Sequence, residues 1–340
     1  MRLGLIGLGR IGAFHAQTLH DLDRVDSLVV TDADPGVTAT VAERVGAEAV
    51  DSPEQLFAAG VDGVLIAAAT AAHPALLLAA VDAGLPVFCE KPLAADVAGA
   101  VEVAGRVAGA RVQIGYPRRF DAAFLGARSA VLSGELGALH TVRSTTLDPA
   151  PPPPAYIAAS GGLFRDCSVH DFDAVRWVTG REVVEVYAVG ANRGEAFFAE
   201  VGDVASASVL LTLDDGTIGV VSNSRYNARG YDVRLEVHGS LDSVAAGLDD
   251  GLPLRSTQPG VTFPAGPPHR FFMDRLATAF RAELGAFVEF VAGERPSPCT
   301  VRDALEVAWT AEAATTSLRE HRPVRIEEVR TARRLVAFEP

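Results

Sequence analysis

Lysine is almost absent from this 340-residue chain, and Lys91 is the only one. All other basic residues are arginine, which stays charged, whereas a lysine can lose its proton when burial or a neighbouring cation lowers its pKa. A site that performs proton chemistry near neutral pH can therefore use Lys91 and could not use an arginine in its place. The alternative is compositional chance, and the position of Lys91 in the fold must decide between the two.

Cysteine and long apolar runs are also scarce. Three scattered cysteines form no C-x-x-C pair, which argues against a disulfide framework and against a zinc cluster, so we expect no metal site. No run of about 18 apolar residues predicts a membrane span. Residues 1–7 lack the pattern of a secretory signal, so we expect a cytoplasmic protein. A net charge of -13 disfavours nucleic acid and anionic membranes as partners.

The first third of the chain alternates short apolar runs with alanine-rich helical runs. This alternation predicts βαβ units and an α/β Rossmann domain, a doubly wound parallel sheet with right-handed crossovers. We expect strands over residues 3–6, 28–30, 64–67, 86–89 and 112–115, and helices over residues 11–20, 36–45, 73–83 and 94–107.

The pattern changes after about residue 120. A proline-rich stretch at 147–154 predicts a stiff extended loop. Four strand-like runs follow at 183–189, 205–213, 217–224 and 233–237, and Asp214-Asp215-Gly216 predicts a hairpin turn between the middle two. Late helices are expected at 271–291 and 301–318. We therefore expect a Rossmann domain over 1–120 and an α+β domain with an open, mostly antiparallel sheet over 121–340, whose last helices could pack back on the first domain.

A glycine-rich motif follows the first predicted strand and opens the first predicted helix. In Gly7-Leu8-Gly9-Arg10-Ile11-Gly12, the first glycine permits the tight turn, the second lets a pyrophosphate approach the backbone, and the third lets helix and strand pack closely. The helix N-terminus supplies N–H groups and partial positive charge for the phosphates. This strand–turn–helix context predicts a dinucleotide site.

Asp32 stands 20 residues beyond Gly12, at the end of the second predicted strand. An acid there accepts hydrogen bonds from the adenosine ribose and repels a 2′-phosphate, so NAD is favoured over NADP. Arg10 could contact a 2′-phosphate, and a simple turn at the strand end is the alternative. Ala68 and His73 follow the next long strand, at the sheet edge where ligands of such folds bind, and are further candidates for cofactor contact.

Lys91 falls just past an apolar strand on that same edge, between Glu90 and Pro92. A second cluster follows the Gly161-Gly162 pair. Asp166, His170 and Asp173 are spaced by four and three residues, which would place them on one helix face. Asp166 near the helix start suits a capping role, and the helix dipole would favour neutral His170, a candidate base. A capped amphipathic helix with a surface histidine is the alternative.

These motifs together resemble the Gfo/Idh/MocA oxidoreductases, and most closely their inositol 2-dehydrogenase branch. The resemblance rests on Gly7–Gly12, on Glu90-Lys91-Pro92, on residues 115–121 (GYPRRFD) and on Asp166-x-x-x-His170-x-x-Asp173. It implies a catalytic trio of Lys91, Asp166 and His170. Its other implied site residues are Arg118, Asp173 and Tyr231 in the substrate pocket, and Gly7, Gly9, Ile11, Asp32 and Glu90 at the cofactor. It also implies a homodimer or homotetramer built on the sheet of the second domain.

The resemblance implies NAD-dependent oxidation of a ring hydroxyl of an inositol-like polyol to a ketone. His170 would take the hydroxyl proton, and Lys91 would stabilise the negative charge that develops on the oxygen. Leu147 stands where the inositol branch often carries arginine. Two alternatives stay open: an aldose or other sugar dehydrogenase with the same trio, and a non-catalytic NAD-binding regulator.

Overall fold

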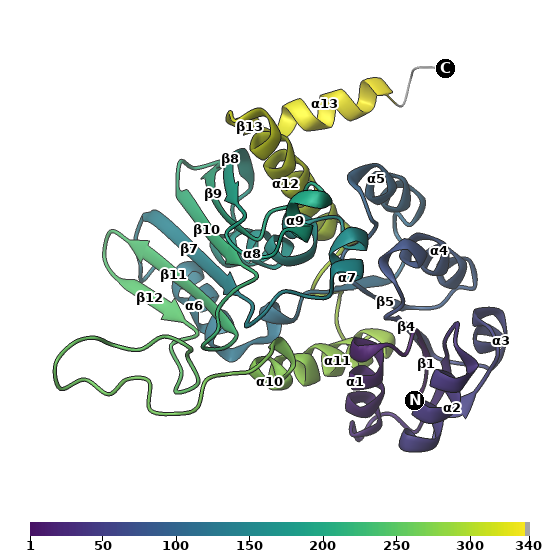
Figure 1. Cartoon of the computed structure of the whole chain (residues 1–340). Helices are drawn as coiled ribbons and strands as arrows, with labels where there is room; N and C mark the ends of the chain where they lie inside the picture. Colours follow the sequence, from purple (N-terminus) through teal and green to yellow (C-terminus); the bar gives the residue numbers. More distant parts are fainter. Residues whose placement is uncertain (337–340) are drawn as a thin grey trace. The chain divides into compact units, whose positions relative to one another are not determined.

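The structure, a computed structural model, describes residues 1–336 and divides into two compact units (Figure 1). The first comprises Met1–Pro117 with Thr278–Leu305, and the second comprises Arg118–Ala277 with residues from Glu306 onward. The chain thus passes from the first unit to the second at residue 117, near the expected boundary at 120. It returns to the first unit for residues 278–305 before it ends in the second.

The first unit is built on a six-stranded sheet in the order β3-β2-β1-β4-β5-β6, in which every pair of neighbours is parallel. This confirms the predicted doubly wound sheet. Its elements are β1 (Arg2–Ile6), α1 (Arg10–His20), β2 (Ser27–Thr31), α2 (Pro35–Val45), β3 (Glu48–Ala49), α3 (Pro53–Ala58), β4 (Gly63–Ile66), a 3-10 turn (Thr70–Ala72), α4 (His73–Asp82), β5 (Val87–Glu90), α5 (Val97–Arg106), β6 (Val112–Gly115) and α11 (Ala277–Val291).

Local chemistry sets where these helices begin. The Asp34 side chain accepts the N–H of Gly36 at 2.8 Å, which caps α2, and the proline at the first helical position is preset for helix. The Asp96 side chain accepts the N–H of Gly99 at 2.8 Å, so α5 starts at Val97 and not at residue 94 as expected. Caps of this kind stabilise a helix by about 1 kcal/mol.

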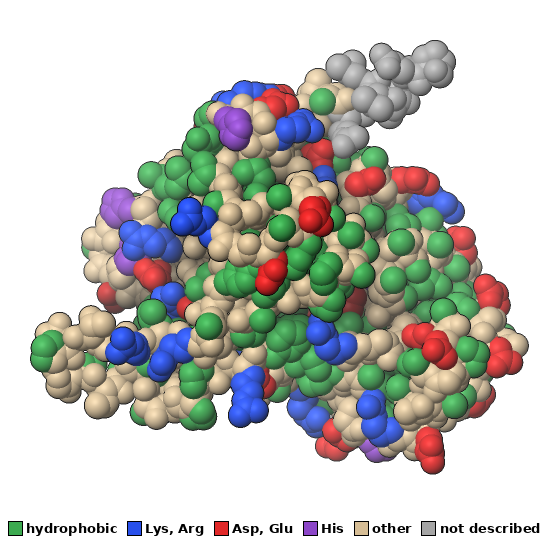
Figure 2. All heavy atoms as spheres, in the orientation of Figure 1, with side chains coloured by type: hydrophobic (Ala, Val, Ile, Leu, Met, Phe, Trp, Pro, Cys, Tyr) green, Lys and Arg blue, Asp and Glu red, His purple; other side chains and the backbone are tan. Residues whose placement is uncertain are grey.

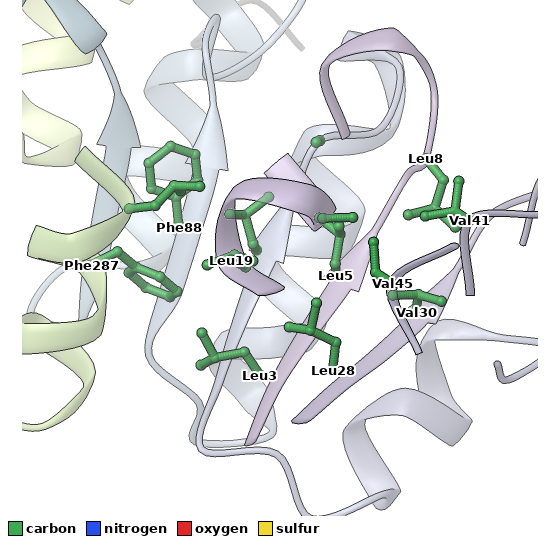
Figure 3. Close-up of a cluster of buried hydrophobic side chains, with 14 of the residues drawn as sticks. Leu3, Leu5, Leu8, Leu19, Leu28, Val30, Val41, Val45, Phe88 and Phe287 are labelled. Atoms are coloured by element: carbon green, nitrogen blue, oxygen red, sulfur yellow. The ribbon is translucent and has the colours of Figure 1, made fainter. Parts of the chain in front are cut away.

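A continuous apolar core fills the first unit (Figure 3). Leu5 of β1 and Val30 of β2 are fully buried, because strands covered by helices on both faces expose neither side. Phe287 of α11 packs against Phe88 of β5 with the two ring centroids 5.7 Å apart. Residues nearly 200 positions later in the chain thus complete the core of the N-terminal sheet.

The second unit is built on a seven-stranded sheet in the order β12-β11-β7-β10-β9-β8-β13. Only β7 and β10 pair in parallel; the other pairs are antiparallel, as predicted. Its elements are a 3-10 turn (Pro117–Phe120), α6 (Ala122–Ser133), β7 (Leu139–Leu147), α7 (Pro154–Ala159), a π-helical turn (Phe164–Ser168), α8 (Val169–Thr179), β8 (Val183–Ala191), α9 (Phe197–Glu200), β9 (Ser206–Leu213), β10 (Ile218–Ser224), β11 (Asp232–Gly239), β12 (Ser243–Ala246), α10 (Phe272–Arg275), β13 (Val324–Arg325) and α13 (Ile326–Val336). α12 (Val301–Glu320) begins in the first unit and continues into the second.

Two local expectations for this half have different outcomes. The hairpin at Asp214-Asp215-Gly216 is confirmed: Gly216 has φ +89°, and the Asp215 side chain accepts the N–H of Thr217. The single helix expected over 271–291 is wrong. It is interrupted at Leu276, which separates α10 from α11, and Asp274 closes the start of α10 by accepting the N–H groups of Arg270 and Phe271.

The surface charge and the helices bear on the possible partners of the protein. Figure 2 shows acidic side chains spread over the surface near α3 and α5, in line with the negative net charge. None of the helices in residues 1–336 is long and apolar enough to cross a membrane. Across the same residues, no three His, Cys, Asp or Glu side chains are grouped so that they could hold a metal ion.

Candidate active site

The glycine turn after β1 is tightly packed at two of its three glycines. Gly7 has φ +90°, and a Cβ there would lie 2.4 Å from the backbone nitrogen of Ala68. A Cβ on Gly12 would lie 1.9 Å from the carbonyl oxygen of Gly7. Any larger residue must therefore displace backbone at either position. The turn lies at the carboxyl ends of the neighbouring strands β1 and β4, where the strand order reverses and ligands of this fold bind.

Gly9 differs, because a Cβ there would meet no heavy atom within 4 Å among the described residues. Packing inside the protein does not require glycine at this position, whereas the approach of a ligand to the backbone does. Gly9 is also the N-cap of α1 and makes no side-chain cap hydrogen bond. The N-terminal turn of α1, which carries Arg10 and Ile11, thus fits a pyrophosphate.

Asp32 lies beside this turn. Its carboxylate accepts the backbone N–H of Leu8 at 2.6 Å and that of Asp34 at 3.0 Å. These two bonds hold the acid at the carboxyl end of β2, next to the glycine turn. The residues of the first unit therefore fit an adenine dinucleotide with an unphosphorylated ribose, as expected for NAD.

Lys91 follows β5 on the same edge and is half-buried. Glu90 before it is buried and lies 2.7 Å from the ring of His15 in α1. Both ring nitrogens of His73, a candidate for cofactor contact, lie against carbonyl oxygens: that of Pro92 at 2.8 Å and that of Ala68 at 3.0 Å. The structure thus gives His73 a bridging position. Cofactor contact by Ala68, His73 and Glu90 stays a prediction.

The candidate residues of the second unit gather where β7 and β10 end side by side. Arg225, just past β10, donates to Asp148 at 2.9 Å and to Asp166 at 2.6 Å. The hydroxyl of Tyr156 in α7 donates to the other oxygen of Asp166 at 2.9 Å. Arg225 thus links the proline-rich loop to the π-helical turn, and α7 joins them through Asp166. Burial opposes the charge on Arg225, but the surrounding anions outweigh it and raise the pKa of the guanidinium.

Asp166 and His170 lie on one helical segment whose first part is irregular. Asp166 lies in the π-helical turn, and α8 begins only at Val169, which puts the half-buried His170 in its first turn. The start of the π-helical turn is capped by Asp203, which accepts the N–H of Leu163 at 3.0 Å. The Asp166 carboxylate instead receives Arg225 and Tyr156. The capping role expected for Asp166 stays a prediction.

A buried polar network lies beneath these residues. Asp171 is fully buried and accepts hydrogen bonds from Arg118 at 2.8 Å and from three uncharged side chains, those of Ser144, Thr146 and Asn223. Burial works against the charge of Arg118, but Asp171 outweighs it and raises the pKa of the guanidinium. The network ties α8 to both parallel strands.

Two other substrate candidates are buried as well. Asp173 forms a two-pronged ion pair with Arg119, with contacts of 2.9 Å and 2.6 Å. Tyr231 is buried, and its burial raises the pKa of the phenol, which keeps it a neutral donor. Substrate contacts by Arg118, Asp173 and Tyr231 stay predictions, because their described partners lie within the protein.

The fold and the cofactor side of the site define a class: an oxidoreductase with an NAD-binding Rossmann domain. Comparison with known families agrees. Residues 1–116 match the model of the oxidoreductase family with NAD-binding Rossmann fold, and residues 124–245 match the GFO/IDH/MocA C-terminal domain. The chain belongs to the GFO/IDH/MocA oxidoreductase family.

Relatives of the chain align over nearly its whole length. Myo-inositol dehydrogenase Hyg17 of Streptomyces leeuwenhoekii is 39% identical, over 93% of this chain and 98% of the relative. Myo-inositol 2-dehydrogenase of Thermotoga maritima is 36% identical, over 97% of this chain and 99% of the relative. The crystal structure of scyllo-inositol dehydrogenase from Lactobacillus casei with bound NAD(H) and scyllo-inositol has a TM-score of 0.84 at 27% identity, covering 96% of this chain and 99% of that one.

Proposed function

We propose that this protein oxidises a ring hydroxyl of an inositol-like cyclic polyol to a ketone, with NAD as the hydride acceptor. The observation that carries the proposal is the presence of Lys91, Asp166 and His170, the trio that the family resemblance implies, in a chain that aligns over nearly its whole length with inositol dehydrogenases. The fit of the Gly7–Gly12 turn and Asp32 to NAD supports the choice of cofactor.

Bound NAD supplies a nicotinamide ring that accepts a hydride at C4. In the proposed reaction the C–H bond of the substrate carbinol breaks with transfer of its electron pair, and the hydroxyl proton passes to His170. Lys91 donates a hydrogen bond to the same oxygen and stabilises the negative charge that develops there. Asp166, held by Arg225 and Tyr156, orients His170 or Lys91 and offsets their charge.

The direct test is a panel of inositol epimers and aldoses, each assayed with NAD and with NADP by the absorbance of the reduced cofactor. We expect inositols with NAD to give the highest kcat/KM. Lys91→Met should lower kcat on the order of 10²–10⁴-fold while the far-UV circular dichroism stays unchanged. Near-normal turnover of folded Lys91→Met would remove Lys91 from the mechanism.

The same panel separates the two alternatives. A sugar dehydrogenase would prefer aldoses over inositols. Leu147, at a position where the inositol branch often carries arginine, is the residue that favours this alternative. A non-catalytic regulator would bind NADH, seen by its fluorescence, and turn over none of the substrates. The presence of all three candidate catalytic residues favours an enzyme.

We also propose that copies of the chain associate through the open face of the seven-stranded sheet. α8 packs on the face that carries the buried residues of β9. The opposite face presents Leu210, half exposed, beside Val220 on the neighbouring strand. Leu210→Glu should lower the mass measured by light scattering, and the control Leu132→Glu, on the exposed surface of α6, should not.

A further inference from the structure

Lys91 lies between two residues that are each held by a histidine. Glu90, immediately before it, lies 2.7 Å from His15 Nε2, and the carbonyl oxygen of Pro92, immediately after it, lies 2.8 Å from His73 Nδ1. Both histidines are essentially without solvent exposure. They come from different helices, α1 and α4, which follow β1 and β4. The residues before and after Lys91 are therefore each held by a histidine of the first unit.

His15 lies in apolar surroundings. Three aromatic rings enclose it, those of Phe14, Phe88 and Phe280, with centroids 5.7–6.0 Å away. Its Nδ1 atom is buried and has no hydrogen-bond partner among the described residues. Because an ionised carboxylate only accepts hydrogen bonds, His15 Nε2 is the donor to Glu90.

Packing on the far side leaves Glu90 little freedom. A Cβ on Gly115, on the neighbouring strand β6, would lie 3.2 Å from Glu90 Oε2. The carboxylate thus fills the space between His15 and β6. A shift of Glu90 would move the end of β5, to which Lys91 is directly attached.

His73 makes the second fastening. Its ring spans the carbonyls of Ala68 and Pro92, so it ties the end of β4, where the glycine turn packs, to the residue after Lys91. A carbonyl oxygen only accepts hydrogen bonds, so the contact with Pro92 requires an N–H on Nδ1. The same ring therefore connects the candidate cofactor edge with the candidate catalytic lysine.

We propose that His15 and His73 are positioning residues that fix the ammonium group of Lys91 for catalysis. The inference rests on the proposed function, because it assigns them a role through Lys91. Displacing a catalytic group by about 1 Å can cost on the order of 10²-fold in rate. Loss of either histidine should therefore lower kcat about 10- to 100-fold.

The test uses two amides that place their N–H at different distances from the backbone. Glutamine reproduces the position of a histidine Nε2, and asparagine that of Nδ1. At position 15 we expect His15→Gln to keep far more activity than His15→Asn, because only glutamine can reach Glu90. At position 73 the order should reverse, with His73→Asn above His73→Gln, because asparagine keeps the bond to Pro92. His20→Gln, on the exposed last residue of α1, is the control and should match the parent protein.

This reversed order is the result that a general loss of stability does not produce, since all four variants are polar and similar in size. The same order at both positions, or full kcat in His15→Asn and His73→Gln, would overturn the inference. A double variant adds a second criterion: in the Lys91→Met background, His15→Asn should cause no further loss of kcat, because its effect passes through the lysine. An equal loss in both backgrounds also overturns it.

The outcome for Lys91→Met separates this inference from the proposed function. If Lys91→Met is inactive and the order at the two histidines is not reversed, the positioning role fails and the proposed function stands. If folded Lys91→Met turns over normally, the role of Lys91 fails, and the positioning role fails with it.

Discussion

Replacing Arg225 tests whether one buried cation organises the substrate side of the site. The Arg225 side chain is 4% exposed and lies between Asp148 and Asp166, whose side chains are 15% and 10% exposed. In Arg225→Met, a side chain of similar length fills much of the same space but donates no hydrogen bond. Two largely buried carboxylates then lose their shared counter-charge.

The expected cost follows from the burial of the group. Breaking a buried ion pair by removing one partner destabilises a protein by about 3–5 kcal/mol. We expect a loss of stability at the lower end of this range, because Tyr156 still donates to Asp166 at 2.9 Å and Asp148 keeps some contact with water. Arg225→Lys should recover part of this loss, since one ammonium group keeps the charge and cannot reproduce the two directed bonds of a guanidinium.

The assay is urea unfolding followed by circular dichroism, with kcat measured across pH on the same proteins. Without the cation, protonation of Asp166 becomes easier, so the acid limb of the kcat profile should move to higher pH. Arg229→Met, at an exposed position four residues on, is the matched control and should change neither quantity. Unchanged stability in Arg225→Met, together with an unchanged acid limb, would refute the reasoning.

Three further predictions concern the first unit and the buried thiols. Asp32→Asn should narrow the preference for NAD over NADP, measured as the ratio of the two kcat/KM values, because it removes the charge that repels a 2′-phosphate; an unchanged ratio would count against Asp32 as the discriminating residue. Gly12→Ala should weaken NADH binding measured by fluorescence titration, because its Cβ would lie 1.9 Å from the carbonyl oxygen of Gly7. Burial raises the pKa of the Cys89 and Cys167 thiols, so thiolate is scarce even at mildly alkaline pH, and a chromogenic disulfide reagent should modify both only after unfolding; rapid reaction of the native protein would contradict this.

The Rossmann half could be predicted from the sequence because its signals are local. Each parallel strand is covered on both faces and is therefore a short continuous apolar run, and each helix has its cap within a few residues. The turn from Gly7 to Gly12 combines three backbone requirements in six positions. Patterns of this length are visible without knowledge of the fold.

β7 could not be predicted in the same way. Its inward positions include Ser144 and Thr146, which are buried because they donate to Asp171, 25 to 27 residues later in the chain. Two of the three buried residues of this strand carry hydroxyl groups, so it has no apolar alternation to detect. The polar network therefore explains both why the strand is stable and why its sequence gave no strand signal.

The residues that hold the candidate catalytic side chains in place could not be predicted from the sequence for a related reason. The sequence marked the residues proposed to act on substrate, Lys91 and Asp166, through short motifs. Their supports, His15 and Arg225, bind partners 75 and 59 residues away. A motif is a run of neighbouring residues and can be recognised in the sequence alone. The residues that hold a catalytic side chain in place depend on which strand ends the fold brings together. The carboxyl ends of β1 and β5 lie along the same side of the first sheet, and β7 and β10 are neighbours in the second. His15 and Arg225 could therefore be recognised as supporting residues only once the strand order was known. The same reasoning predicts that variants of these supports lower kcat while every motif that identifies the family stays intact.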